Sequence, residues 1–475
     1  MEVLKINYFE TMNEQLSRKD LLKAVLLSFG IAHYDFEEIN GTTVTLYKFR
    51  PQIGVRVSKI RNLKDEIAAT LGTQSVRITA PMEDGAVGIE IPNQKREIVS
   101  LESCIESEKF SNTDMALPCC LGRTITDDVF VADLAEMPHL LVAGATGQGK
   151  SVGLNVILMS LMNKLNPDEL KFVLIDPKQV EFSVYENFPA AYFANLGTCE
   201  NICTDIESAE ETLEALCQVM EQRYSLLRES KVRNIKEYNA SSTEKMPYVV
   251  VVVDEYGDLV MTSGAKVEKY ICRIAQKARA VGIHMIISTQ RPSATIVTGN
   301  IKANFPARIA FRTTNGTDSR IIIDRLGAEK LTGNGDMLFC TGIDSLRVQG
   351  AYVDTEYILG FRDELTLKYS DYENKCLLEN EEEEIKIKLS SPLLPGIEEI
   401  AHKLADYCSE INDNVVYYVH GGYDIQAHKV LEQLMELGIV GPPVDYFHMK
   451  CRLMTQDKYK ISAIINNYKR LCSGN

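Results

Sequence analysis

The feature that most constrains this chain is the octet GATGQGKS at residues 144–151, which has the pattern G-x-x-x-x-G-K-[ST]. A short apolar run, Leu140–Ala143, precedes it, and the helical pattern SVGLNVILMSLMNKL follows it. In such a strand–loop–helix context, glycines let backbone N–H groups wrap phosphates, and the positive end of the helix assists them. The octet therefore predicts a nucleotide-binding α/β domain. The alternative, a chance glycine-rich turn, is disfavoured by the flanking strand and helix.

The octet also predicts which side chains meet the nucleotide. We expect Lys150 to reach the β- and γ-phosphates and the Ser151 hydroxyl to ligate Mg²⁺. The expected binding set is the loop with the first helical turn: Gly144, Ala145, Thr146, Gly147, Gln148, Gly149, Lys150, Ser151 and Val152.

A second motif lies about a hundred residues further on, where the run YVVVVV at residues 248–253 is followed by Asp254 and Glu255. Ligands gather at the carboxyl ends of strands in open α/β sheets. We expect Asp254 to hold Mg²⁺ and Glu255 to polarise the attacking water. Taken alone, this Asp-Glu pair is commonly just a helix N-cap; together with Lys150 it predicts a nucleotide-hydrolysis site.

A third motif is IISTQRP at residues 286–292, in which a strand ends in polar residues. Gln290 is the candidate sensor of the γ-phosphate, because an amide can contact both a phosphate and the attacking water. In isolation this motif is weak, and an ordinary cap at a strand end is the competing interpretation.

The pattern around these motifs predicts the fold class. Short apolar runs alternate with helical stretches between residues 117 and 353: HLLVAG, KFVLID, YVVVVVD, IHMIIST and RIAFRT. Such runs are typical of a parallel sheet buried on both faces. Upstream, we expect a helix over 10–29, a helix over 63–71, and strands from TVTLYKF, GVRVSKI, SVRITA and VGIEI, which together make a small α+β module.

Composition narrows the classes of function. The net charge of −15 argues against a general nucleic-acid coat, yet the span 273–330 carries ten Lys or Arg and three acids. This local excess fits a phosphate-lined groove, although pairing with acids elsewhere is equally plausible for any one residue. The twelve cysteines lack zinc spacing and are expected to be reduced thiols. No signal peptide or bilayer span is expected, which favours a cytoplasmic protein.

The motor motifs closely resemble those of the FtsK/SpoIIIE family of DNA translocases. The segments that carry the resemblance are HLLVAGATGQGKSVGLN, VLIDPKQVEFSVYENFP, VVVVVDEYGDLV, RIAQKARAVGIHMIISTQRPSATIVTGNIKAN and PARIAFRTTNGTDSRIIIDRLGAEKLTGNGDML. Upstream, the segment from GVRVSKI to REIVSL resembles the alpha subdomain of the family. Downstream, GGYDIQAHKVLEQLMELGIVGPP resembles its winged-helix gamma domain more weakly.

The resemblance implies a hexameric ring that uses ATP to pull double-stranded DNA through its channel. Arg279 stands where the family places an arginine finger, and Arg291, Lys302 and Arg320 stand near the family's channel contacts. The implied fold is an α/β, RecA-like P-loop motor with an N-terminal α+β subdomain and a C-terminal winged-helix-like domain. The expected bounds are an N-terminal helical segment at 1–34, the alpha-type subdomain at 35–110, the ATPase at 111–365, an acidic linker at 366–395, the gamma-like domain at 396–445 and a tail at 446–475.

Several departures from the family pattern keep alternatives open. The chain lacks the family's usual membrane spans, it has Asn315-Gly316 where a lysine is usual, and it carries an additional stretch at 196–205. Asp424 would repel phosphate, so a gamma-like domain used for docking a protein partner is as plausible as one that reads DNA. The competing functions are a ring ATPase that moves protein in secretion and an ATP-switched DNA-binding initiator or partition factor. Glu255 and Arg279 argue against the switch.

Overall fold

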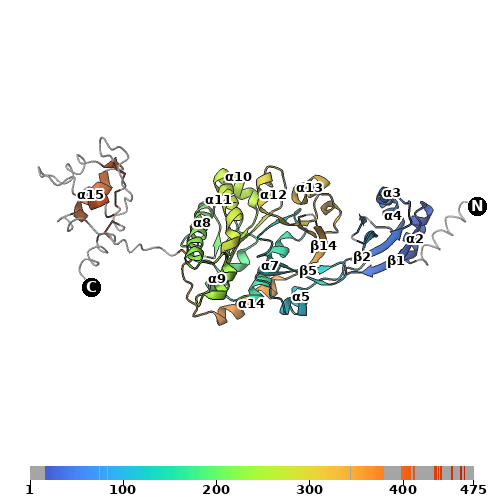
Figure 1. Cartoon of the computed structure of the whole chain (residues 1–475), viewed down its shortest axis with the longest axis horizontal. Helices are drawn as coiled ribbons and strands as arrows, with labels where there is room; N and C mark the ends of the chain where they lie inside the picture. The colour runs from blue at the N-terminus through green and yellow to red at the C-terminus, as the bar shows by residue number, and fades with distance from the viewer. Residues whose placement is uncertain are drawn as a thin grey trace, which may run out of the picture. The chain divides into compact units, whose positions relative to one another are not determined.

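The structure is a computed structural model that describes residues 17–378 apart from 74, 83, 200 and 343. Beyond these it describes only 397–407, 410–411, 433–435, 437, 439–440, 451–452, 461–462 and 465. The chain divides into two compact units, Met1–Leu378 and Glu379–Asn475 (Figure 1). Among the described helices, none is both long enough and apolar enough to span a bilayer.

In the second unit the described elements are α15 (Ile397–Tyr407) and the antiparallel pair β15 (Glu410–Ile411) and β16 (Cys451–Arg452). The acidic run at 381–384 and the turn at Gly422-Tyr423 lie outside the described residues, and so does most of the expected winged-helix-like domain.

The first unit begins with a four-stranded antiparallel sheet in the order β1-β2-β4-β3, packed against three helices. Helix α2 contributes Leu22, Val25 and Leu26 to the core of this module, so the helix and the sheet share one hydrophobic cluster. Part of the helix expected over 10–29 lies before the described residues. The elements are α2 (Arg18–Ser28), β1 (His33–Asn40), β2 (Val44–Pro51), α3 (Val57–Asn62), α4 (Lys64–Thr70), β3 (Arg77–Thr79) and β4 (Val87–Pro92).

Two local expectations for this module were incomplete or wrong. The segment GVRVSKI is not a strand, because α3 occupies most of it and buries only Ile60, with Lys59 and Arg61 in the favourable last turn. Strand β1 was not anticipated. It is a half-exposed edge strand whose register is broken by a bulge between Tyr34 and Glu37, so it lacks a clean alternation of apolar and polar residues.

The rest of the first unit is built on a ten-stranded sheet in the order β6-β5-β14-β13-β12-β7-β11-β10-β8-β9. The expected parallel strands are present: β7 (His139–Ala143), β8 (Leu170–Ile175), β10 (Tyr248–Val253), β11 (Ile283–Thr289) and β12 (Ala307–Phe311). This confirms the α/β class. An antiparallel extension was not expected, and it consists of β5 (Pro118–Thr124), β6 (Val129–Asp133), β13 (Asp336–Thr341) and β14 (Asp344–Gly350).

The parallel strands are apolar throughout because helices cover both faces of the sheet (Figure 1). In β7, Leu140 and Val142 face one core while Leu141 and Ala143 face the other, and β10 alternates in the same way. The first core includes α5 (Leu101–Ile105), α6 (Glu108–Ser111), α7 (Lys150–Lys164) and α14 (Thr355–Lys368). The second includes α8 (Ile206–Glu229), α10 (Tyr256–Ser263), α11 (Ala265–Lys277), α12 (Gly299–Asn304) and α13 (Gly316–Ile323).

The small module is tied to the large sheet by a buried ionic network. The Arg347 guanidinium contacts both carboxylate oxygens of Asp336, at 2.9 and 2.6 Å, and also pairs with Glu90 of β4. Glu90 in turn accepts from Arg77 of β3 at 2.7 Å. The three central residues of the network are Arg347, Asp336 and Glu90, and each is at most 4% exposed. Removing one of these charges would leave buried charge without full compensation.

The additional stretch at 196–205 forms the far edge of the sheet. Its short strand β9 (Ile202–Cys203) pairs in parallel with the end of β8, and Cys199 and Cys203 are joined in a disulfide. The expectation of reduced thiols throughout is therefore wrong for this pair. Seven other cysteines in the described part of the chain are free, and most of them are buried.

Two buried histidines begin neighbouring strands of the large sheet. Burial lowers the pKa of His139 to about 3 and that of His284 to about 4. His139 Nδ1 accepts from the Met285 amide at 3.0 Å, and His284 Nδ1 lies 2.9 Å from the Pro138 carbonyl oxygen. Both rings are therefore neutral in the fold.

This burial predicts a pH-dependent stability. Below about pH 6.5 the unfolded chain takes up protons on both histidines and the folded chain does not, so the free energy of unfolding falls as the pH is lowered from 6.5 towards 4. The limiting slope is about 1.4 kcal/mol per pH unit for each histidine. Denaturant melts between pH 7 and 5 should show a shallower loss in His139→Asn/His284→Gln than in the wild type. An identical dependence of the free energy of unfolding on pH in both proteins would refute the assignment of this effect to the two histidines.

Candidate active site: a phosphate loop beside a buried carboxylate pair

The octet at 144–151 forms the turn between β7 and α7 that its sequence predicted. Gly147 has φ 74° and Gly149 has φ 113°, so the loop uses left-handed backbone that glycine adopts without strain. A Cβ on Gly149 would lie 2.8 Å from the backbone of Gly335, and one on Gly144 would lie 2.6 Å from Phe311 Cβ. The loop is thus a cradle held tightly between neighbouring segments, with the N-terminus of α7 at its end.

Lys150 is buried at the start of α7, where its ammonium donates to Asp254 and lies 3.1 Å from Ser288 Oγ. The Ser288 hydroxyl also donates to Asp254 Oδ1, at 2.8 Å. Asp254 follows β10 and Ser288 lies in β11, which pairs with both β10 and β7. The three adjacent strands β7, β11 and β10 therefore bring these side chains to one edge of the sheet.

Glu255 is buried beside this group in a left-handed backbone conformation, φ 46°. Its carboxylate accepts from Thr289 Oγ1 at 2.8 Å and from the Gln290 amide at 3.1 Å, and Lys178 Nζ lies 3.8 Å away. A non-glycine residue with such a φ is strained, and strain of this kind clusters at functional sites. The competing expectation of a simple helix cap does not describe Glu255, because its side chain makes no capping hydrogen bond to α10.

Gln290 reaches the phosphate loop directly, because its Oε1 accepts from Thr146 Oγ1 at 2.8 Å. The structure therefore brings together Thr146, Lys150, Asp254, Glu255 and Gln290, which lie on three separate motifs of the sequence.

A further segment, residues 176–182, reaches the same site and was not assigned a role from the sequence. The Asp176 carboxylate accepts hydrogen bonds from backbone amides of this turn and so fixes it. The turn places the side chains of Lys178 and Glu181 beside Glu255 and Ser151. Lys178 pairs with Asp258 at 2.8 Å, and the hydroxyl of Ser151 donates to Glu181. The signal that could have found them is the polar sequence DPKQVE directly after the buried strand β8.

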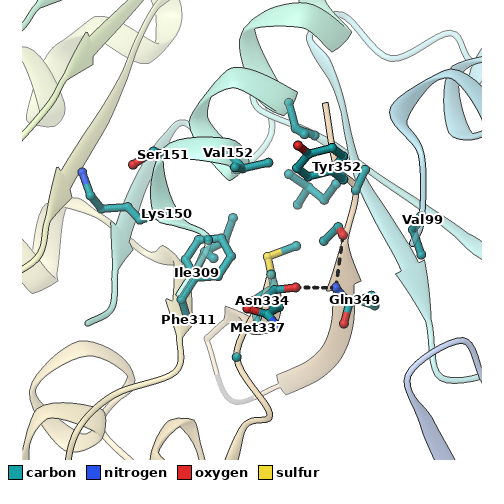
Figure 2. Close-up of a pocket in the computed structure, with 18 of the residues that line it drawn as sticks. Val99, Lys150, Ser151, Val152, Ile309, Phe311, Asn334, Met337, Gln349 and Tyr352 are labelled. Atoms are coloured by element: carbon teal, nitrogen blue, oxygen red, sulfur yellow. Dashed lines mark hydrogen bonds between the residues drawn. The ribbon is translucent and has the colours of Figure 1, made fainter. Parts of the chain in front are cut away.

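A cavity of about 560 Å³ opens beside the phosphate loop (Figure 2). Val152 lines it from α7, Tyr352 and Gln349 line it from the end of β14 and the residues after it, and Val99 lines it from the segment that joins the two modules. Gln349 Nε2 donates to the Asn334 carbonyl at 2.9 Å and fixes one wall. The volume is in the range of small-molecule sites. Val152 belongs to the binding set that the sequence predicted, whereas Val99, Gln349 and Tyr352 carry no motif and were not predicted.

Comparison with known proteins identifies the family of this chain. Residues 4–93 match the FtsK alpha domain and residues 100–294 match the FtsK/SpoIIIE family. The chain belongs to the FtsK/SpoIIIE family.

The similarity to individual relatives covers most of this chain. A DNA translocase FtsK of Clostridium tetani (strain Massachusetts / E88) is 38% identical over 443 residues, 91% of this chain and 58% of that protein. One of Chlorobaculum tepidum (strain ATCC 49652 / DSM 12025 / NBRC 103806 / TLS) is 49% identical over 305 residues, 63% of this chain and 38% of that protein. This member of the family thus spans about half the length of the curated relatives it matches.

Among solved structures, the monomer form of the pCW3 conjugation coupling protein TcpA with ATPγS is similar. It has a TM-score of 0.51 and 25% sequence identity, and the match covers 73% of this chain and 99% of that chain.

The residues that the FtsK/SpoIIIE resemblance implicates in DNA contact lie in different local settings. Lys302, at the end of α12, pairs with Asp324 at 2.8 Å and lies 3.4 Å from the Arg320 carbonyl oxygen. The structure thus brings Lys302 and Arg320 together but neutralises the lysine. Arg291 and Arg320 are exposed, and neither forms an ion pair with another described residue. Among the described contacts, at least five of the ten basic residues in 273–330 pair with acids: Arg273, Lys277, Lys302, Arg308 and Lys330.

Arg279 is exposed in a short 3-10 turn before β11, at the end of the sheet opposite to the phosphate loop. Strand β11 runs from Ile283 to Thr289, which corresponds to about 20 Å of extended chain. Arg279 is therefore remote from the carboxylate pair of its own chain.

The packing of the phosphate loop in this FtsK/SpoIIIE chain predicts a sharp glycine requirement. In Gly149→Ala the new methyl group would meet the Gly335 backbone and the residue would keep a strained φ, so we expect nucleotide binding to weaken about tenfold or more. Titration of a fluorescent ATP analogue measures this change. Gly299→Ala is the matched control, because a Cβ there has open space and it should bind as the wild type does. Unchanged affinity in Gly149→Ala would refute the cradle.

Proposed function

We propose that this chain is the motor of an ATP-driven double-stranded DNA translocase. The observation that carries the proposal is the placement of Glu255, a buried carboxylate fixed by Thr289 and Gln290 beside the Lys150–Asp254 pair. A protein that only bound nucleotide would need no such positioned base. The family membership and the relatives named DNA translocase FtsK support DNA as the substrate.

The residues present fit a nucleotide with its magnesium ion. The glycine cradle and the N-terminus of α7 suit a phosphate chain, and the cavity lined by Val152 and Tyr352 suits the base and ribose of ATP. Ser151 and Asp254 offer hard oxygen donors of the kind Mg²⁺ prefers, and we propose that they hold it. When bound, the ion would neutralise charge that develops on the phosphates.

In this proposal the chain's own residues divide the work of hydrolysis. Lys150, held by Asp254 and Ser288, supplies a positive charge to the β- and γ-phosphates. Glu255 accepts a hydrogen bond from the attacking water and orients it, while Gln290, which bridges to Thr146 of the loop, reports whether a γ-phosphate is present.

We further propose that Arg279 acts on the site of a neighbouring subunit in a ring. Its distance from its own carboxylate pair excludes a role there, and its exposure leaves it available to another chain. An arginine supplied in trans stabilises transition-state charge and links hydrolysis to the position of the neighbour. On the support of the family resemblance, we propose a RecA-like motor in a hexameric ring, with a C-terminal winged-helix-like domain.

For DNA, Arg291 and Arg320 are the proposed phosphate contacts of this chain. Both are exposed and unpaired within the described residues, whereas Lys302 would have to leave Asp324 to reach a phosphate. Contacts of this kind hold the backbone without reading sequence, and they weaken as salt rises.

The first test is the rate of ATP hydrolysis with linear duplex DNA, with single-stranded DNA and without DNA, at low salt. We expect duplex DNA to stimulate the rate strongly and single strands to stimulate it little. Glu255→Gln should hydrolyse at least about a hundredfold more slowly, because the positioned base is lost while ATP still binds. Arg291→Ala/Arg320→Ala should keep the basal rate and lose the stimulation.

Two results would contradict the proposal. Equal rates with and without every DNA would favour a ring ATPase that handles protein, and full activity in Glu255→Gln would remove the assigned base. Arg279→Ala should bind ATP normally and lose turnover; normal turnover would remove its proposed role in trans.

A further inference from the structure

The hydroxyl of Ser151, the proposed magnesium ligand, donates its hydrogen bond to Glu181 of the turn after β8. We propose that Glu181 is a positioning residue that orients Ser151 for the metal. This inference rests on the proposed function, because it assumes that Ser151 holds Mg²⁺.

The chemistry of a hydroxyl explains why the partner matters. A serine has one proton and two lone pairs, and only a lone pair can bind a cation. When the proton is donated to Glu181, the lone pairs of Ser151 Oγ are left for the metal, and rotation of the hydroxyl is restricted. Partners that orient a ligand in this way typically change metal affinity 10–100-fold when they are removed.

The turn that carries Glu181 is fixed rather than loosely solvated. The buried carboxylate of Asp176 accepts from the amides of Lys178 at 3.1 Å and of Val180 and Phe182 at 3.0 Å each. Phe182, the next residue after Glu181, is fully buried in the core beneath α7. The backbone on both sides of Glu181 is therefore held, and its carboxylate is aimed at the first turn of α7.

The chain also offers few other ligands to a metal at this place. The part of the chain that the structure describes contains no group of three or more His, Cys, Asp or Glu residues arranged to hold an ion. A magnesium ion would depend on Ser151, Asp254 and the phosphates, so the orientation of one hydroxyl has a large share in its affinity.

Metal affinity measured directly tests this inference without relying on turnover. Mn²⁺ is titrated by electron paramagnetic resonance into the full chain saturated with a non-hydrolysable ATP analogue. We expect the dissociation constant for Mn²⁺ to rise about 10–100-fold in Glu181→Ala and less in Glu181→Gln, which keeps an acceptor oxygen and loses the charge. Binding of the analogue in EDTA should stay within about twofold of the wild type for both variants, because the phosphate loop is intact.

Two controls separate this role from a general effect. Glu186→Gln removes a charge from an exposed position shortly after this segment and should leave Mn²⁺ affinity unchanged. Adding Glu181→Ala to Ser151→Ala should cause no further loss, because Glu181 acts through the serine.

Each remaining outcome counts against the inference. Three results would overturn it while leaving the ATPase proposal standing. They are wild-type Mn²⁺ affinity in Glu181→Ala, a full additional loss of Mn²⁺ affinity when Glu181→Ala is added to Ser151→Ala, and an equally large loss of affinity for the ATP analogue in EDTA. Absence of metal binding in the wild type would overturn both this inference and the proposed magnesium site.

Discussion

The buried contact of Lys150 with Asp254 and Ser288 is the interaction on which the site depends. It joins the first residue of α7 to the ends of β10 and β11, so three strands that are far apart in sequence converge on one ammonium group. A charge this deeply buried would be strongly destabilising without its partners. The parallel order β7-β11-β10 is what makes this convergence possible, since it brings the carboxyl ends of these strands to the same edge.

The same strand order separates the phosphate site from Arg279, the residue that we propose acts on a neighbouring subunit. Groups that follow the strands, such as Glu255 and Gln290, lie at the phosphate edge, whereas Arg279 precedes β11 and lies at the opposite edge.

The antiparallel strands β5, β6, β13 and β14 extend the sheet beyond β12. Strands β13 and β14 carry Asp336 and Arg347, the part of the ionic network that reaches Glu90 in the small module. Asp336 also accepts a hydrogen bond from the amide of Thr332, so the network borders the loop that contains Thr332 and Gly335. The amide of Gly335 in turn donates to the carbonyl of Gln148 in the phosphate loop.

Much of this was accessible from the sequence, for physical reasons that differ between elements. The strands β7, β8, β10 and β11 are buried on both faces, so each reads as an uninterrupted apolar run, and the phosphate loop needs glycines at fixed positions. Strand β1 was not predicted because it is an edge strand with a bulge. Helix α3 was predicted as a strand because Val55 and Val57 alternate with polar residues. Tyr352 was not predicted because its role arises from tertiary placement, which no spacing rule encodes. Glu181 was not predicted either, although it lies in a polar sequence directly after a buried strand, which is a signal for a ligand site.

The central claim is that this chain moves along double-stranded DNA. Its most direct test is displacement of a third strand from a triplex formed on linear duplex DNA in the presence of ATP, monitored by gel electrophoresis or by fluorescence. A chain that moves along double-stranded DNA should strip the third strand from distant sites with wild-type protein and ATP. It should not do so with Glu255→Gln or with a non-hydrolysable analogue. Displacement that proceeds equally without hydrolysis, or no displacement by a wild-type protein that hydrolyses ATP on DNA, would contradict the account of this chain as a translocating motor.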